Sequence, residues 1–413
     1  MLDLKLIRAE PDRVRAALAR RGEGDAVDRV LELDGRRREL LPRLEELRSR
    51  QNKASDEIGA RKRAGEDADA AISAMRAVAD EAKSLGAELS GVEEELDAAL
   101  AVLPNPPEES AADQDEVLRE VGEGGAAGKD HLELLGDLVD LEAGARVAGA
   151  RFVYLKGPLV MLELALVRWA LELLSERGFT PVIPPALVRE EALYGTGFLP
   201  DTEQQIYSVP GDELYLAGTS EVPLASLHAG EIVPGAELPL RYAGFSPCFR
   251  REAGAAGKDT HGIFRVHQFD KVEMFSFVEP SSAAEEHEHL LAIEEELLQA
   301  LEIPYRVVNI AVDDLGASAA KKYDLEAWLP GQGRYRELTS ASNTTDYQSR
   351  RLKVRYRPGS GGGPTEVHTL NGTAVAVGRT IIALVENHQQ ENGTIVMPAV
   401  LREHGAPDTL SAA

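Results

Sequence analysis

The sequence predicts an α+β protein with two parts. The first is an N-terminal antiparallel α-helical coiled-coil hairpin, and the second is a domain with a mostly antiparallel sheet flanked by helices. Apolar residues recur at heptad spacing over residues 30–61 and 71–103, which is typical of paired helices. From residue 179 onward, short strand-like segments are joined by hairpin-like or irregular connections, which favour antiparallel pairing. A dinucleotide-binding doubly wound sheet is excluded because no strand–GxGxxG–helix unit occurs.

The composition of the chain limits its domain count and the compartment in which it resides. A chain of 413 residues with 43% hydrophobic content can bury a large core and has room for two or three domains. The single cysteine, Cys248, excludes an internal disulfide and favours a reducing compartment. The first residues lack the basic and apolar segments of a signal peptide, and no run is long enough to cross a membrane. We therefore expect a cytoplasmic protein with no membrane partner.

The hairpin comes first in the chain, at about residues 27–103 of an N-terminal domain that spans residues 1–103. Its second arm has only apolar residues at the heptad seam, and the predicted turn covers residues 59–67. At about 1.5 Å per residue each arm extends roughly 50 Å, a length that core packing does not explain. Pro42 removes one helical hydrogen bond, so the first arm has a reason to bend there.

Charge is distributed unevenly along this hairpin. The formal charge of −25 argues against indiscriminate nucleic-acid binding. Residues 29–63 nevertheless carry eleven basic and seven acidic residues, whereas residues 66–103 carry two and ten. A basic strip on an acidic protein directs a nucleic acid to one place. Taken alone, the pattern is more typical of solvated helix faces.

Pro104-Asn105-Pro106-Pro107 ends the second arm, and the acidic, Gly-rich residues 104–129 are predicted to be a linker. Residues 130–413 form the larger domain. Its predicted helices cover residues 159–177, 283–301 and 380–389. Its predicted strands cover residues 179–185, 213–217, 240–250, 264–277, 305–310, 335–339 and 367–370.

Candidate site residues concentrate on two of these strands. Phe249-Arg250-Arg251-Glu252 ends one, and His267-Gln268-Phe269-Asp270-Lys271-Val272-Glu273 belongs to the next. An arginine fork suits a phosphate oxygen, an aromatic face stacks on a purine, and a carboxylate accepts from an amine. Arg379 is presented at the start of a predicted helix, where the dipole favours anions. Together these features predict a site for an adenine nucleotide and an amine.

Other motifs have ordinary structural roles as their alternatives. Gly254-Ala255-Ala256-Gly257-Lys258-Asp259 lacks the glycine and the hydroxyl of a P-loop, and we expect a mobile loop over a nucleotide instead. His287-Glu288-His289 lacks metal-site spacing and is predicted to be a solvated helix face. Thr219-Ser220-Glu221 is either a helix cap or part of a polar pocket. Glu337-Leu338-Thr339-Ser340 either shares magnesium or forms a turn, and no serine has the context of a catalytic triad.

Along nearly its whole length the chain resembles the bacterial-type seryl-tRNA synthetases, a family of class II aminoacyl-tRNA synthetases. The family's motifs 1, 2 and 3 resemble residues 159–185, 245–275 and 371–386, and the hairpin resembles its tRNA-binding arm. Further family-like phrases are Leu193-Tyr194-Gly195-Thr196-Gly197, Trp328-Leu329-Pro330-Gly331-Gln332-Gly333-Arg334-Tyr335 and His368-Thr369-Leu370-Asn371-Gly372. Threonyl and prolyl relatives would not combine these phrases with such a hairpin.

The resemblance implies three catalytic residues: Arg250 at the α-phosphate, Glu252 at the adenine amine and Arg379 at the γ-phosphate. Phe269 would stack on adenine, and Arg265 would be a further phosphate contact. The full ATP-binding set that we expect is Arg250, Arg251, Glu252, Arg265, Val266, Phe269, Glu337, Leu338, Thr339, Ser340 and Arg379. Glu337 and Ser340 would also hold Mg²⁺.

For serine, the resemblance implies Glu273 at the ammonium group and hydroxyl and carboxylate groups around the side chain. The expected serine-binding set is Thr219, Ser220, Glu221, Arg250, Glu273 and Thr373. The expected tRNA-binding set is Arg36, Arg37, Arg48, Lys53, Arg61, Lys62 and Arg63. Ser220, Arg251, Thr373 and the stretch Thr339-Ser340-Ala341-Ser342-Asn343-Thr344 depart from the family pattern and alter the rim of the serine pocket without removing a charge.

The activity implied is the ATP-dependent ligation of L-serine to tRNA(Ser) through seryl-adenylate by a homodimer that uses ATP and Mg²⁺. Whether tRNA(Sec) is a second substrate is left open by the sequence. Motif 1 would form the dimer interface, and the lack of clustered cysteines predicts no structural zinc. A specialised duplicate, serving a biosynthetic pathway or inhibitor resistance, is an alternative. A second alternative is a regulatory paralogue that ligates nothing, but the intact Arg250, Glu252, Glu273, Glu337 and Arg379 count against it.

Overall fold

The computed structural model describes residues 2–200, 205–253, 261–359 and 361–411. The chain divides into two compact units, Met1–Pro104 and Asn105–Ala413. The loop 254–259, which we expected to cover a nucleotide, lies outside the described residues.

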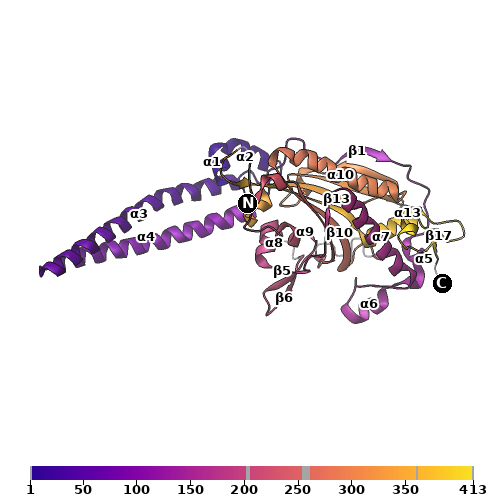
Figure 1. The fold of residues 1–413 in the computed structure, drawn as a ribbon, viewed down its shortest axis with the longest axis horizontal. Coiled ribbons are helices and arrows are strands. Elements are labelled where there is room, and N and C mark those ends of the chain that lie inside the picture. The colour runs from indigo at the N-terminus through magenta and orange to yellow at the C-terminus, as the bar shows by residue number, and fades with distance from the viewer. Residues whose placement is uncertain (1, 201–204, 254–260, 360, 412–413) are drawn as a thin grey trace. The chain divides into compact units, whose positions relative to one another are not determined.

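The first unit is helical throughout its described elements: α1 (Leu4–Ala9), α2 (Pro11–Ala19), α3 (Ala26–Ala64) and α4 (Asp69–Val102). The long helices α3 and α4 lie side by side as a hairpin (Figure 1) and bury leucines such as Leu40, Leu44, Leu85 and Leu89 between them. The predicted helical hairpin is therefore confirmed.

The hairpin differs from the prediction at its tip. Helix α3 continues beyond the predicted start of the turn to Ala64 and ends at Gly65, whose φ of 71° is the left-handed conformation that glycine adopts without strain. Pro42 lies inside α3 on an exposed position, and the helix continues across it. The connection between the arms is consequently short, which favours antiparallel packing.

The second unit is built around an eight-stranded sheet of order β1-β11-β12-β13-β16-β10-β9-β4. Every neighbouring pair is antiparallel except β4 with β9, so the mostly antiparallel sheet is confirmed. In that order the strands are Glu116–Val121, Tyr305–Asn309, Lys321–Leu329, Arg334–Thr345, His368–Ala376, Gln268–Val278, Leu240–Phe249 and Thr180–Val182.

The remaining elements surround this sheet. The helices are α5 (His131–Leu135), α6 (Leu141–Ala148), α7 (Pro158–Glu176), α8 (Glu190–Thr196), α9 (Glu221–Ala225), α10 (Ala283–Ala300), α11 (Tyr347–Leu352), α12 (Val377–Asn387) and α13 (Ala399–Glu403). The short strands are β2 (Val139–Asp140), β3 (Tyr154–Leu155), β5 (Leu187–Arg189), β6 (Tyr207–Val209), β7 (Leu214–Leu216), β8 (Ile232–Pro234), β14 (Arg355–Arg357), β15 (Thr365–Glu366), β17 (Ile395–Val396) and β18 (Thr409–Leu410). None of the described helices combines the length and apolarity that crossing a membrane requires.

Helix α10 covers one face of the large sheet. Ser276 of β10 donates to Glu286 at 2.7 Å, and Thr339 of β13 donates to Glu294 at 2.9 Å, both carboxyls being on α10. Because side chains alternate along a strand, Lys271 and Glu273 of β10 point to the opposite face. That opposite face is the one available for a ligand.

Two predictions about this unit need correction. Residues 104–129, predicted to be a linker, contain β1, which pairs with β11 at the edge of the large sheet. Nothing in this acidic, Gly-rich stretch reveals a partner nearly two hundred residues away. Strand β12 was not predicted as a strand at all, although it lies between β11 and β13.

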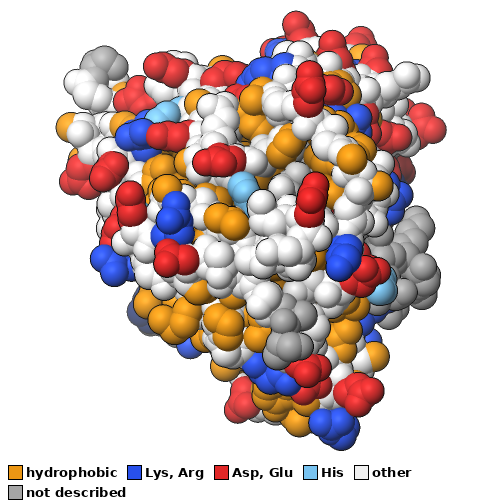
Figure 2. All heavy atoms as spheres, turned by 90° about the vertical axis from the view of Figure 1, so that its right-hand side faces the viewer, with side chains coloured by type: hydrophobic (Ala, Val, Ile, Leu, Met, Phe, Trp, Pro, Cys, Tyr) orange, Lys and Arg blue, Asp and Glu red, His pale blue; other side chains and the backbone are white. Residues whose placement is uncertain are grey.

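The surface of the chain reflects its acidic composition. On the face shown in Figure 2, acidic side chains are spread widely, with basic side chains among them and hydrophobic side chains exposed between. The acidity of this face is therefore distributed rather than gathered in a single patch.

Candidate active site

A cleft lies where the end of β9 meets β10, β13, β16 and the first turn of α12. Charged groups and aromatic rings stand together in it. Its lining residues are Arg250, Glu252, Ile263, Phe264, Arg265, Val266, Phe269, Lys271, Glu337, Leu338, Thr339, Thr373, Ala376, Gly378 and Arg379. The structure therefore brings together residues predicted separately from two strands, a helix start and a C-terminal motif.

Arg250 directly follows the last residue of β9, and two contacts hold its side chain. Its Nε donates to the carbonyl of Gly218 at 3.1 Å, and its guanidinium carbon lies 5.5 Å from the centre of the Phe269 ring. Glu252, two residues on, forms an ion pair with Arg265. Glu252 has a φ of 51°, a strained conformation for a residue with a side chain, and such strain is concentrated at functional sites.

Arg379 lies in the first turn of α12, as the sequence predicted. Its guanidinium carbon is 4.6 Å from the centre of the Phe264 ring, and its Nη1 donates to the carbonyl of Glu337 at 3.1 Å. The same nitrogen lies 3.4 Å from the Glu337 carboxylate. Arg250 and Arg379 thus present two guanidinium groups to one cleft, an arrangement suited to a polyphosphate.

A bulge in β13 decides the position of Glu337. Leu325 of β12 pairs with Thr339, whereas Glu326 pairs with Glu337, so Leu338 is an extra residue. Residues three apart in a regular strand point to opposite faces, but the extra residue returns Glu337 and Ser340 to the same face. Asp324 of β12, which accepts a hydrogen bond from Ser340, joins them there.

These three residues offer the oxygen ligands that Mg²⁺ prefers. Burial raises the pKa of Asp324 to about 7, and its Oδ1 is buried without a hydrogen-bond partner. Packing around the Glu337 carboxyl opposes its ionisation although the side chain is 52% exposed, but the neighbouring Arg379, Lys322 and Arg250 hold its pKa below the usual value. The group therefore fits a divalent cation, with Asp324 as a member that sequence reasoning missed.

A second group of polar side chains lies deeper, beside β10. Lys271 forms an ion pair with Glu273 and donates to Thr219 Oγ1 at 2.8 Å. Asn371 of β16 donates to Glu273 at 3.2 Å, and Thr373 pairs with Glu273 across the strands. The result is a cluster of buried and half-buried hydroxyl, carboxylate, ammonium and amide groups that borders the cleft at Lys271 and Thr373.

Glu221, at the start of α9, joins this polar cluster. Burial, reinforced by the nearby Glu273, raises its pKa to about 7, although Lys271, Gln348 and Arg250 act in the opposite direction. Gln348 donates to the Glu221 carboxylate at 2.7 Å and accepts from Thr369 at 3.0 Å. The carboxyl is therefore fixed by a side chain that lies 127 positions away in the chain.

Two predicted site residues do not present their side chains to the cleft. The hydroxyl of Ser220 contacts the Ser246 hydroxyl at 2.7 Å and the Gly244 carbonyl, against the sheet. Arg251 is exposed and does not line the cleft.

The local sequence pattern could have identified one of the site residues that the prediction missed, but not the other three. Lys271 lies two positions before Glu273, so strand periodicity alone places it on the same face. Asp324, Gln348 and Asn371 carried no such signal, because their partners are distant in sequence.

The motif His287-Glu288-His289 was wrongly predicted to be a solvated face. His287 is buried, stacks on Tyr323 with ring centres 4.7 Å apart, and contacts the carbonyl of Ala341. Burial lowers its pKa to about 4. The residue is a neutral core histidine, and no group of three or more potential metal ligands of the His, Cys, Asp and Glu types occurs in the described part of the chain.

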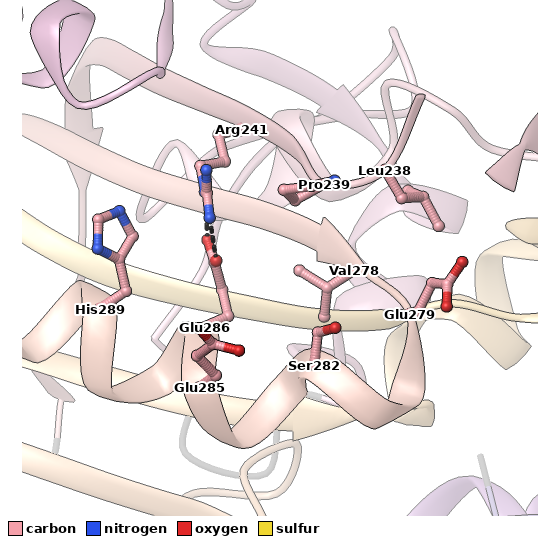
Figure 3. A pocket seen from close by; sticks show the side chains of 9 residues that line it. All are labelled: Leu238, Pro239, Arg241, Val278, Glu279, Ser282, Glu285, Glu286 and His289. Carbon is pink, nitrogen blue, oxygen red and sulfur yellow. Dashed lines mark hydrogen bonds and ion pairs between the residues drawn. The ribbon is translucent and has the colours of Figure 1, made fainter. Parts of the chain in front are cut away.

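A separate hollow of about 340 Å³ lies between α10 and the neighbouring ends of β9 and β10. Figure 3 shows Arg241 and Glu286 turned toward each other and paired. Ser276 also donates to Glu286. Burial opposes ionisation of this carboxyl, but the hydrogen bonds from Arg241 and Ser276 hold its pKa below the usual value. These contacts join sheet and helix, so we assign the hollow a structural role.

The seven basic residues of the hairpin that were predicted to bind tRNA fall into two groups. Arg36 pairs with Glu88 and Arg37 with Glu93 on the opposite arm, and Arg61 pairs with Glu57 on its own helix. Among the described residues, no ion pair involves the remaining four, which are exposed: Arg48, Lys53, Lys62 and Arg63. These four lie in the half of α3 that leads to the tip.

Two family models match the chain. Residues 1–107 match the seryl-tRNA synthetase N-terminal domain, and residues 206–388 match the tRNA synthetase class II core domain (G, H, P, S and T). The serine–tRNA ligase of Thermobifida fusca is 50% identical over 421 residues, covering 99% of both chains. That of Thermococcus kodakarensis is 47% identical and covers 97% of this chain and 95% of its own.

Solved structures agree along the full length. The seryl-tRNA synthetase of Pyrococcus horikoshii, complexed with ATP, is 43% identical with a TM-score of 0.91 and covers 100% of both chains. The cytoplasmic serine–tRNA ligase of Naegleria fowleri, in complex with AMP, is 34% identical with a TM-score of 0.87 and covers 100% of this chain and 99% of its own.

Proposed function

Since the chain belongs to the seryl-tRNA synthetase family, we propose that its cleft aligns ATP and L-serine for the two steps of the ligation. The chain catalyses the ATP-dependent ligation of L-serine to tRNA(Ser) through a seryl-adenylate. The observation that carries the proposed site is the convergence of Arg250, Glu252 and Arg379 on one cleft.

In the first step the serine carboxylate attacks the α-phosphate of ATP. The carboxylate is already ionised at neutral pH, so the step needs alignment and charge neutralisation rather than a general base. Arg250 would contact the α-phosphate and Arg379 the γ-phosphate. Glu252 would accept from the adenine amine, while the ring of Phe269 stacks on the base. Oxygen–phosphorus bond formation then releases pyrophosphate, whose charge Arg379 neutralises.

Magnesium belongs to this proposal. Glu337 and Ser340, with Asp324 beside them, would hold it, and the ion would neutralise charge on the leaving phosphates. Leu338 and Thr339 would contribute main chain at the same place, and the bulge at Leu338 orients both neighbours.

Serine recognition is proposed for the polar cluster beside the cleft, which we call the serine pocket. Glu273 would bind the ammonium group, with Thr219, Glu221 and Thr373 around the hydroxyl. An analogue without the hydroxyl would leave these buried partners without a hydrogen bond, so we expect discrimination against alanine.

In the second step the seryl group moves from the adenylate to a terminal ribose hydroxyl of tRNA. We propose that the hairpin binds the tRNA through its exposed basic residues. The four without an ion pair, Arg48, Lys53, Lys62 and Arg63, would contribute more than Arg36, Arg37 and Arg61, which are already in ion pairs. Serylation of tRNA(Sec) is part of the proposal and is checked by charging both transcripts.

We also propose a cytoplasmic homodimer of the bacterial type that lacks structural zinc. Helix α7 supports the dimer, because Val160, Met161 and Leu164 are 39%, 51% and 55% exposed along it. Exposed apolar residues on one helix mark an interface. Relatives at similar identity come from bacteria and archaea alike, so the bacterial type stays a prediction.

The test is serine-dependent ATP–pyrophosphate exchange, run against threonine and alanine, with tRNA charging measured in parallel. Exchange with serine that the Arg250→Ala and Glu273→Gln variants lose would support the assigned sites. Wild-type exchange that survives both substitutions would overturn the sites, and a folded chain that binds tRNA without any exchange would favour the regulatory paralogue.

A further inference from the structure

Lys271 is a buried cation to which the proposed binding of ATP and serine assigns no role. It is 6% exposed, lies on β10 and lines the cleft. Its ammonium group forms an ion pair with Glu273 and donates to Thr219 Oγ1 at 2.8 Å. Both groups that Lys271 contacts are proposed to bind serine, so Lys271 belongs to the same cluster of polar side chains.

Charge explains why the pocket needs this cation. Glu221 and Glu273 are both buried, 8% and 1% exposed, and lie close enough that Glu273 raises the pKa of Glu221. Two carboxylates cannot share a buried site without compensation. Serine is a zwitterion and adds no net charge. Lys271 and Arg250 therefore balance the two carboxylates both before and after serine binds.

We propose that Lys271 is a positioning residue for serine: it holds Glu273 and Thr219 in the arrangement that receives the amino acid and balances the paired carboxylates. This inference rests on the proposed placement of serine in this pocket. An ion pair with only a structural role would affect folding stability and every substrate alike. A positioning role instead changes serine binding selectively.

The test separates the two substrates by kinetics. Lys271→Met removes the charge and keeps the length of the side chain, and Lys271→Arg keeps the charge. We expect the methionine variant to raise KM for serine about 30-fold or more in pyrophosphate exchange, because truncating one partner of a buried charge pair is costly. We expect KM for ATP to change by less than about threefold, and Lys271→Arg to restore part of the serine affinity.

A matched control comes from the same sheet. Lys321 of β12 is also partly buried and lies 4.8 Å from the centre of the Tyr323 ring, outside the cleft. Lys321→Met should leave KM for serine at the wild-type value. Should Lys271→Met fail to fold, Lys271→Gln removes the charge and keeps a hydrogen-bond donor for Thr219, and the same comparison of KM values is made on it.

The pH profile adds a second readout. Glu273, Lys271, Arg250 and Gln348 face Glu221, and the buried Cys248 thiol also lies within the field of Lys271. Lys271 opposes the raised pKa of Glu221, so its removal should move the limb of kcat/KM for serine that reports Glu221 to higher pH.

Two results would overturn the inference: equal changes in KM for serine and for ATP, or an unchanged KM for serine in Lys271→Met while Glu273→Gln raises it. A different result identifies a different failure. If Glu273→Gln and Lys271→Met both leave KM for serine unchanged, the placement of serine is wrong and the inference falls with it.

Discussion

The hairpin unit and the sheet unit differ in where they place their charged side chains. The hairpin buries a repeating apolar seam and leaves its basic residues at the surface, where Arg48, Lys53, Lys62 and Arg63, among others, have no ion pair among the described residues. The sheet unit instead buries charged groups, among them Glu221, Glu273 and Lys271. The first arrangement tolerates change at its surface, whereas the second depends on partners that are far apart in the chain.

Removing the hairpin gives the strongest test of this separation. Deletion of residues 27–103 should abolish tRNA charging and leave serine-dependent exchange largely intact, because the cleft residues all belong to the other compact unit. Exchange and charging assays on the same preparation measure it. Equal loss of both activities would mean that the sheet unit needs the hairpin for its stability.

Arg250→Ala should be the most damaging single change in the sheet unit. Loss of this guanidinium removes charge stabilisation at the reacting phosphate, and we expect kcat/KM for exchange to fall about 10²- to 10³-fold. Thermal unfolding should barely change. Arg402→Ala is the control, since Arg402 is 43% exposed on α13 and its substitution should keep full exchange. A variant that retains exchange would remove Arg250 from the chemistry.

Neutralising the unpaired basic residues should weaken tRNA binding alone. Converting Arg48, Lys53, Lys62 and Arg63 to Gln should raise KM for tRNA roughly tenfold to a hundredfold. The slope of affinity against salt concentration, both on logarithmic scales, should become shallower by about one unit for each phosphate that the variant no longer neutralises. Exchange without tRNA should be unaffected.

The matched variant converts Arg36 and Arg37 to Gln. Its effect on KM for tRNA should be smaller, because Glu88 and Glu93 already occupy those guanidinium groups. An equal or larger effect would show that the interarm pairs open when tRNA binds.

The smallest expected effect concerns a buried carboxyl beneath the cleft. Glu294 is fully buried on α10, and burial raises its pKa well above the usual 4.5. A raised pKa in the folded state gives a contribution to stability that is complete below pH 4.5 and is lost as the pH rises. Glu294→Gln should therefore gain stability relative to wild type above that pH, by at most about 1.4 kcal/mol per pH unit.

Chemical denaturation from about pH 4.5 to about pH 8 measures this difference. Glu296→Gln is the matched control on the same helix, because Glu296 is 38% exposed and paired with Arg177. A Glu294→Gln variant whose stability runs parallel to wild type across this range would show that Glu294 is ionised in the folded protein.

Much of the architecture followed from the sequence alone. Heptad spacing predicted the hairpin because a seam repeats within a few residues. The predicted strands 240–250 and 305–310 match β9 and β11 to within one residue, whereas β10 begins at Gln268 rather than at the predicted residue 264. Strand periodicity also places Lys271 and Glu273 on one face. These features depend on neighbours in the chain, and local sequence records them.

The tertiary structure decided the rest. Strand β1 pairs with β11 across the sheet edge, Gln348 reaches Glu221, and the bulge at Leu338 turns Glu337 and Ser340 to the same face. Burial of His287 and the raised pKa of Glu221 have the same origin. Each depends on which distant segments pack together. Side-chain environment is a property of that packing, and so the chemistry of the pocket became visible only once the chain was folded.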